Sequence, residues 1–170
     1  MRKITVMILA TVALMGCGPA NSAAEADAFV NRAIIAACKD LVTDYAIARD
    51  HGDAEGYAAT FAQDGELILP SGSFKGRDQL RQRLTENRGK SVSRHMMSTT
   101  QIKVVDTENA VGISYAVIYI EPAPDKGSTG AVATQGPAAI GEYRDSFRLT
   151  DQGWKFSRRE FVPVFSLQVD

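Results

Sequence analysis

Apolar residues recur at helical spacing in the first half of the chain and predict three helices. The longest runs from about residue 25 to 49, where the apolar face is as wide as that of a helix laid across a sheet. A second, short helix is predicted over 54–61, with Asp53 as its N-cap, and a third over 76–87. A strand over 66–69 is predicted between the second helix and the third.

After Gly89 the apolar period changes from helical to alternating, which predicts strands. Polar turns at 106–109 and 151–153 would join these strands into two hairpins. The connection 121–137 contains three prolines and three glycines, and loops of this length are often functional or mobile. The four expected strands cover about 93–105, 110–120, 138–150 and 154–165.

This order of elements predicts an α+β fold in one domain. The chain of 170 residues is long enough for a single core, and it contains no internal repeat. We expect a mostly antiparallel sheet that curls around the three N-terminal helices and leaves a cavity between sheet and helices. The domain is predicted to span 25–165, followed by a short tail at 166–170.

The start of the chain has the pattern of a bacterial signal peptide. Two basic residues precede an apolar run from Ile4 to Met15, which is too short to span a bilayer. The run leads into Gly16-Cys17 and resembles the lipobox of bacterial lipoproteins, although a residue smaller than Met15 is more usual there. We therefore predict removal of residues 1–16, a lipid on Cys17 and a small-residue tether over 17–24.

A lipid on Cys17 would hold the domain on a membrane of the cell envelope. Gly18 after the cysteine favours the outer membrane, with the domain facing the periplasm. The alternative is plain secretion with cleavage within 20–24, which would release a soluble periplasmic protein. A Cys17–Cys38 disulfide belongs to that alternative; otherwise Cys38, within the apolar helical pattern, is expected to be a buried free thiol.

Composition and charge narrow the range of partners. Apolar residues make up 45% and charged residues 23% of the chain, and the formal net charge is −1. Neither nucleic acid nor an anionic membrane surface is therefore expected as a partner. Two histidines and the absence of paired-cysteine spacing predict no metal site. Without a phosphate-binding glycine loop or a Gly-x-Ser-x-Gly elbow, we also expect no cofactor.

Several short motifs follow one another between residues 35 and 160. They are Tyr45-Ala46-x-Ala48-x-Asp50-x-Gly52-Asp53, Tyr57-x-x-x-Phe61-x-x-Asp64-Gly65, Gly76-Arg77, Arg94-His95-Met96, Gly141-x-Tyr143-x-Asp145-x-Phe147 and Gly153-Trp154-Lys155-Phe156. In this order they resemble the SnoaL-like family of the nuclear transport factor 2-like superfamily, which includes scytalone dehydratase and polyketide cyclases. The resemblance implies a cone-shaped α+β barrel, with a curved sheet wrapped on helices and a pocket at the open end, and a homodimer paired through sheet faces.

The resemblance also implies a catalytic pair, Asp50 with His95. In scytalone dehydratase and its relatives an aspartate and a histidine at matching positions meet at the pocket. A carboxylate fixes the tautomer of an imidazole and raises its basicity, so that the ring can move a proton at neutral pH. The structural alternative is that Asp50 pairs locally and His95 only satisfies buried hydrogen bonds. The chain departs from the dehydratase at Arg49, where that enzyme has a tyrosine, and its other histidine, His51, is expected at the surface.

Strand alternation suggests which neighbours share the pocket with the histidine. If His95 points inward, Met97 and Thr99 should do the same, whereas Met96 and Ser98 should point outward. The candidate substrate-binding residues are Tyr45, Met97, Tyr115 and Tyr143. Met97 follows from strand alternation, and the tyrosines could donate to a carbonyl or hold an enolate-like charge.

Strand tyrosines also have a structural interpretation, because half-buried strands favour them. Similarly, Asp145 is expected to form an ion pair across the sheet with Arg158 or Arg159.

Two functions of different class fit these observations. The first is a cell-envelope enzyme that uses His95 and Asp50, without a cofactor, to move a proton on a small apolar molecule. Dehydration, isomerisation and cyclisation all match this lyase or isomerase chemistry. The second is a non-catalytic domain for ligand binding or assembly on a lipid anchor.

Overall fold

The computed structural model of the chain describes residues 19–165. The predicted signal peptide, the predicted lipid attachment at Cys17 and the tail 166–170 lie outside the described residues. Within 19–165, no helix has both the length and the apolar character needed to cross a membrane.

Three helices form in the described part of the chain, close to their predicted positions. Helix α1 (Pro19–His51) begins before residue 25 and includes part of the stretch expected as a tether. Helix α2 (Ala54–Ala59) starts where the Asp53 carboxylate accepts the Gly56 backbone N–H at 2.9 Å. It ends earlier than predicted because the chain from Phe61 already pairs as a strand. Helix α3 (Arg77–Asn87) matches its prediction to one residue.

Within residues 19–165, six strands form one sheet. They are β1 (Phe61–Leu69), β2 (Gly72–Lys75), β3 (Ser91–Val104), β4 (Asn109–Pro122), β5 (Ala139–Thr150) and β6 (Gly153–Phe165). Their order is β2-β1-β6-β5-β4-β3, and every neighbouring pair is antiparallel except β1 with β6. Strand β1 is longer than predicted, and the short β2 was not predicted.

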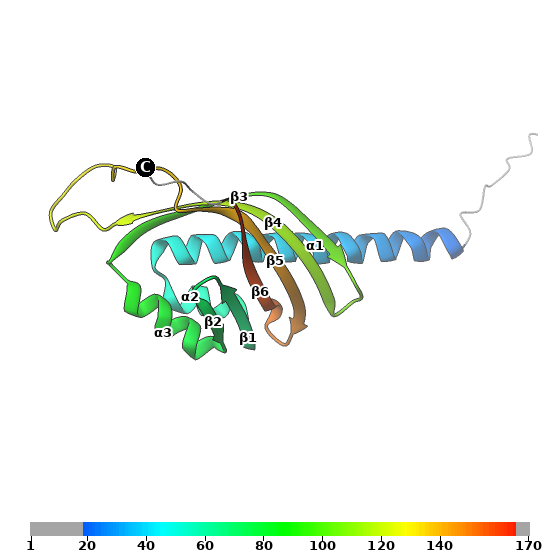
Figure 1. Ribbon diagram of the computed structural model, residues 1–170. Helices are drawn as coiled ribbons and strands as arrows, with labels where there is room; N and C mark the ends of the chain where they lie inside the picture. The colour runs from blue at the N-terminus through cyan, green and yellow to red at the C-terminus, as the bar shows by residue number, and fades with distance from the viewer. Residues whose placement is uncertain (1–18, 166–170) are drawn as a thin grey trace, which may run out of the picture.

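The sheet curves over α1, with α2 and α3 at one end of the molecule (Figure 1). This arrangement confirms the α+β class and the curved, mostly antiparallel sheet wrapped on helices. The sheet stays open, with β2 and β3 as its edges, and does not close into a barrel.

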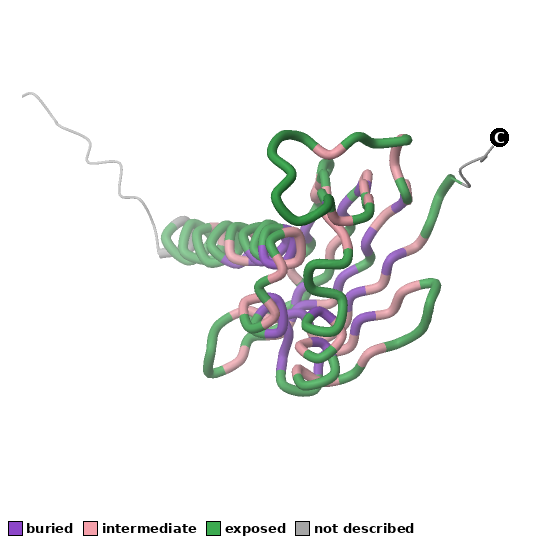
Figure 2. The backbone as a smooth tube through the Cα atoms, turned by 90° about the vertical axis from the view of Figure 1, so that its left-hand side faces the viewer, coloured by how far each residue is buried: buried purple, intermediate pink, exposed green. Residues whose placement is uncertain are grey.

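The core lies between the concave face of the sheet and the helices, where buried segments of α1, α2, α3 and the strands face one another (Figure 2). Cys38 is fully buried there as a free thiol, as expected of a small apolar side chain. The first part of α1 lies beyond the sheet, and Phe29 on it is 68% exposed. Only from Ile34 onward does α1 supply buried side chains among the described residues.

Strand β3 contains a bulge that changes which residues face the helices. The register with β4 shifts between Ser98 and Thr100, and Thr99 adopts a positive φ of 42°. His95 and Met97, before the bulge, face inward as expected, and Met96 faces outward. The prediction that Thr99 faces inward is wrong, because the extra residue takes it out of the alternation and leaves it exposed.

Candidate functional site

A carboxylate at the end of α1 meets a histidine on β3. Asp50 Oδ1 lies 2.6 Å from His95 Nδ1, and Asp50 Oδ2 accepts the His95 backbone N–H at 2.7 Å. The Ser93 hydroxyl donates to Asp50 Oδ1 at 2.8 Å. The His95 side chain is only 5% exposed and the Asp50 side chain 7%. The predicted meeting of Asp50 and His95 is thus present in the structure.

These hydrogen bonds define the chemistry of the pair. Burial by itself raises the pKa of Asp50, but the hydrogen bonds and charge of His95 and the Ser93 hydroxyl outweigh burial and lower the pKa below 3.8. At neutral pH Asp50 is therefore a carboxylate that can only accept. His95 Nδ1 must then carry the proton that lies between the two side chains, which leaves Nε2 as the acceptor nitrogen of the neutral ring.

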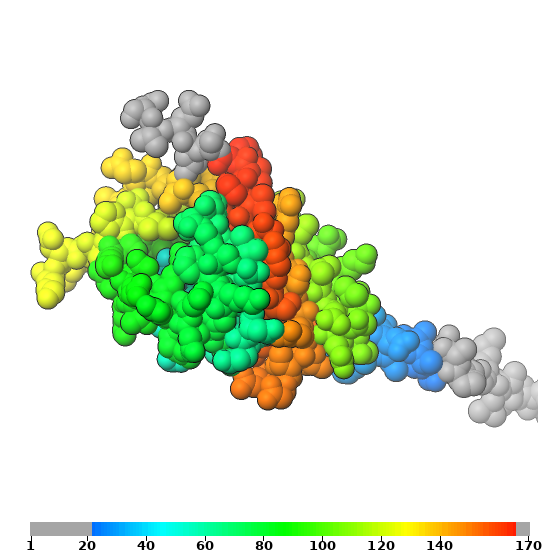
Figure 3. Space-filling model, turned by 60° about the horizontal axis from the view of Figure 1, so that its bottom comes forward, coloured from blue at the N-terminus to red at the C-terminus, as the bar shows by residue number. Residues whose placement is uncertain are grey.

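His95 lies in the wall of a cavity of about 430 Å³ between the sheet and the helices. Apolar side chains from the strands make up much of its wall, among them Leu69, Ile118, Ile120 and Phe161. The end of the molecule formed by α3 and the β1–β2 hairpin is seen in Figure 3, beside the start of the loop after β4. Ser71, between β1 and β2, and Ala138, at the end of the loop after β4, both line the cavity.

Two of the four predicted substrate-binding residues line this cavity. Tyr45 on α1 and Tyr143 on β5 are almost fully buried, and the Tyr45 ring stands perpendicular to the His95 ring with centroids 6.3 Å apart. Burial, with the neighbouring Tyr45, raises the pKa of Tyr143 well above 10, so its hydroxyl keeps its proton. Met97 shares the inward face with His95 but packs against the core instead of lining the cavity.

The placement of Tyr115 corrects the prediction. Ala116 pairs with Met97 and is buried on the inner face, so Tyr115 beside it faces outward opposite Ser98 and is 50% exposed. It lies on the other side of the sheet from His95 and does not contribute to the cavity. His51 is exposed, as expected, and lines a different hollow on the outer side of α1 and α2.

The predicted ion pair of Asp145 forms with Arg159, beneath the cavity. Arg159 Nε lies 3.7 Å from Asp145 Oδ1, and both side chains are fully buried. The guanidinium stacks on the rings of Tyr45 at 4.2 Å and Tyr143 at 4.0 Å. Burial raises the pKa of Asp145 to about 6, although the Arg159 charge lowers it. Arg159 therefore packs against both of the tyrosines that line the cavity.

Sequence reasoning missed three polar residues of the site. Ser93, which holds Asp50, lies two residues before His95 and so on the same face of β3, which the alternation could have indicated. Arg83 lines the cavity from α3, one position before the buried Leu84. Arg49 was noted only as a departure from the dehydratase pattern, yet it also lines the cavity.

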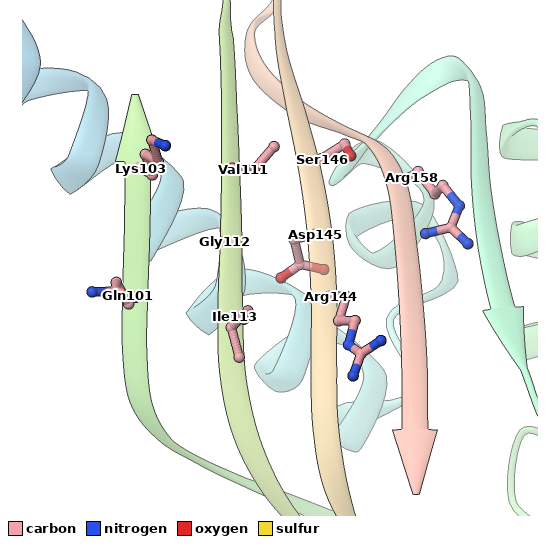
Figure 4. Close-up of a pocket in the computed structure, with 9 residues that line it drawn as sticks. All are labelled: Gln101, Lys103, Val111, Gly112, Ile113, Arg144, Asp145, Ser146 and Arg158. Atoms are coloured by element: carbon pink, nitrogen blue, oxygen red, sulfur yellow. The ribbon is translucent and has the colours of Figure 1, made fainter. Parts of the chain in front are cut away.

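A second hollow, of about 370 Å³, lies on the opposite face of the sheet. Lys103, Val111, Ser146 and Arg158 line it from four neighbouring strands (Figure 4). Among the described residues, no histidine lines this second hollow, whereas His95 lines the inner cavity. Across residues 19–165 there is no group of three His, Cys, Asp or Glu side chains arranged to hold a metal ion.

Comparison with known proteins gives matches over most of the chain. Residues 32–160 match the SnoaL-like domain family. No curated protein matches the sequence.

Three solved structures are similar to the chain. A nuclear transport factor 2-like protein with a cystatin-like fold from Novosphingobium aromaticivorans is 20% identical, with 87% of this chain and 91% of that chain covered and a TM-score of 0.63. A candidate scytalone dehydratase from the same organism is 26% identical, with coverages of 76% and 83% and a TM-score of 0.63. ActVI-ORFA from Streptomyces coelicolor is 21% identical, with coverages of 76% and 96% and a TM-score of 0.61.

Proposed function

The chain belongs to the SnoaL-like domain family, and from that premise we propose that it is a cofactor-independent lyase or isomerase acting on a small, largely apolar molecule. The observation that carries the proposal is the 2.6 Å contact of His95 Nδ1 with the Asp50 carboxylate in the wall of an apolar cavity. The likeness to a candidate scytalone dehydratase supports the same class of reaction.

The proposed base is His95 Nε2. It takes a proton from a carbon next to a carbonyl group, and the imidazolium that forms is stabilised by Asp50 through Nδ1. The proposed donor to the developing enolate oxygen is the hydroxyl of Tyr143, which lines the cavity and keeps its proton. The imidazolium then returns the proton, either to a leaving hydroxyl group, which departs as water, or to another carbon, which isomerises the substrate.

Exchange of carbon-bound protons for deuterium tests this step before the natural substrate is identified. An apolar cyclic ketone such as 2-tetralone, followed by NMR in D₂O, reports proton abstraction directly. We expect His95→Gln to slow the protein-dependent exchange by about 10²–10⁴-fold, the usual contribution of one positioned acid–base group. His51→Gln is the matched control, because that ring is exposed and outside the cavity, and it should change the rate less than about threefold.

A variant that stays folded and retains the rate would overturn the proposed base. Equal rates for wild type and His95→Gln, with unchanged circular dichroism, are that result. A ligand that is retained without turnover by the wild type, and lost by His95→Gln, would instead favour the non-catalytic binding domain.

We also propose that the protein is an exported lipoprotein of the bacterial cell envelope. The apolar run before Cys17 and the likeness of its end to a lipobox support this. Wild type should incorporate a labelled fatty acid and fractionate with membranes, whereas Cys17→Ser should do neither. Wild-type protein without the label, found in the soluble fraction, would mean that the protein is secreted without a lipid.

A further inference from the structure

We propose that the ligand of the cavity carries an anionic group, such as a carboxylate, that binds between Arg49 and Arg83 while its apolar body lies against the strands. The inference rests on the proposed function in one respect, that the cavity is the substrate site. It narrows the expected substrate class from a small, largely apolar molecule to an amphiphilic acid.

The two arginines reach the cavity from different helices. Arg49 comes from the end of α1 and Arg83 from α3, and both are half-buried in its wall. Arg83 also stacks on the Phe74 ring, 4.8 Å from its centroid, which restricts the guanidinium before any ligand arrives.

Neither arginine has a carboxylate partner within the described part of the chain. The ion pairs there involve Arg81, Arg144, Arg148, Arg158 and Arg159, together with His95. Arg49 and Arg83 thus differ from these residues in being partly withdrawn from water without a counter-charge. Partial burial without a partner costs solvation energy, which an incoming anion would offset.

The charges of the two arginines act on the same buried side chain, that of Tyr57. Tyr57 on α2 is fully buried, and its ring lies against that of Tyr45 with centroids 5.2 Å apart. Burial, followed by the neighbouring Tyr45, raises the pKa of Tyr57, while Arg83 and Arg49 both lower it. Arg49 and Arg83 line the same cavity from two helices, so their charges create a positive field at its helix side.

Nothing in the cavity wall neutralises that field. No aspartate or glutamate lines the cavity. The nearest carboxylate in the site, Asp50, already accepts the Ser93 hydroxyl and both N–H groups of His95. A carboxylate on the ligand would receive charge-assisted hydrogen bonds from the planar guanidinium groups, which fit its geometry.

The test uses two probes with the same ring and different charge, 2-naphthoate and the neutral 2-naphthamide, titrated into the full-length protein by calorimetry. We expect the wild type to bind the acid at least about tenfold tighter than the amide, as a charged, partly desolvated contact provides. Arg49→Gln and Arg83→Gln should each remove most of that preference and leave amide binding unchanged. Arg88→Gln is the matched control, because Arg88 is exposed at the end of α3 and outside the cavity.

Each outcome decides the question. If the acid binds no tighter than the amide, including the case in which neither binds, the proposal is wrong. It is also wrong if the arginine variants, with unchanged unfolding curves, keep the preference for the acid. Loss of proton exchange in His95→Gln with the acid preference intact supports both ideas, whereas an intact exchange rate with the same preference removes the proposed base and leaves the anion site standing.

Discussion

Arg159 and Asp145 are a charged pair in the middle of an aromatic core. The guanidinium nitrogens and the Asp145 oxygens make no hydrogen bond within the described residues, and the Nε–Oδ1 distance of 3.7 Å is long. Three ring faces, those of Tyr45, Tyr143 and Phe156, take the place of water around the charge. Such a pair costs more to bury than it returns, so its value lies in holding the two tyrosines of the cavity.

Replacing the Asp145 carboxyl tests its raised pKa through the pH dependence of stability. The pKa of Asp145, about 6 in the folded protein, lies above that of an unfolded aspartate. As the pH rises from about 4 to 6 the unfolded chain releases this proton first, so folded wild type loses up to about 3 kcal/mol of stability from this group. Asp145→Asn has no such proton, so its unfolding free energy relative to wild type should rise over this range, as measured in urea.

A surface carboxyl provides the control of opposite sign. The hydrogen bond from Arg148 lowers the pKa of Asp64, so that group stabilises the folded state at neutral pH and loses its effect as the pH falls below 3.8. The unfolding free energy of wild type should therefore increase relative to that of Asp64→Asn as the pH rises to about 4. A difference between wild type and Asp145→Asn that stays constant from about pH 4 to 7 would contradict the raised pKa.

At the scale of elements, two strands decide what the cavity contains. The β3 bulge at Thr99 comes after His95 and Met97 in the chain. Both side chains therefore keep the inward direction that strand alternation predicts. Along β4, inward positions are small or aliphatic, as at Ser114, Ala116 and Ile118, and Tyr115 faces outward. The cavity forms near the end of the strand, at Ile118 and Ile120.

At the scale of the whole molecule, the outer face of the sheet exposes apolar residues. Met96 is 59% exposed, Val164 58% and Tyr115 50%, with Val111 and Ile113 each at 40%. Exposed apolar residues gathered on one face are typical of interaction sites. On this basis we propose that two copies of the chain pair through this face.

A charge in the middle of this face should separate the two copies. Because the same patch occurs on both copies of a symmetric dimer, Tyr115→Glu places two like charges in one interface. Light scattering should give a dimeric mass for the wild type and a monomeric mass for the variant at the same concentration. Phe29→Glu is the control, since Phe29 is exposed on the part of α1 that lies beyond the sheet. A monomeric wild type, or a dimeric Tyr115→Glu protein, would remove the proposal.

The sequence by itself determined the local elements and indicated that Asp50 and His95 meet. Periodicity located α1, α3 and the four long strands to within a few residues at most boundaries, because apolar spacing reflects which face each element buries. The family resemblance brought Asp50 and His95 together across 45 positions, and the structure has them in contact. The short β2 was missed because four residues carry too little pattern to be recognised.

Only the tertiary structure decided which side chains share the cavity. Strand parity alone could not show that Tyr115 faces away from His95, because the inward face of β4 depends on its register with β3. Arg83 and Arg49, on separate helices, meet at one cavity through the packing of α3 and α1 around the sheet. A sequence pattern records burial along one element, whereas the charge and shape of a cavity result from how several elements pack together.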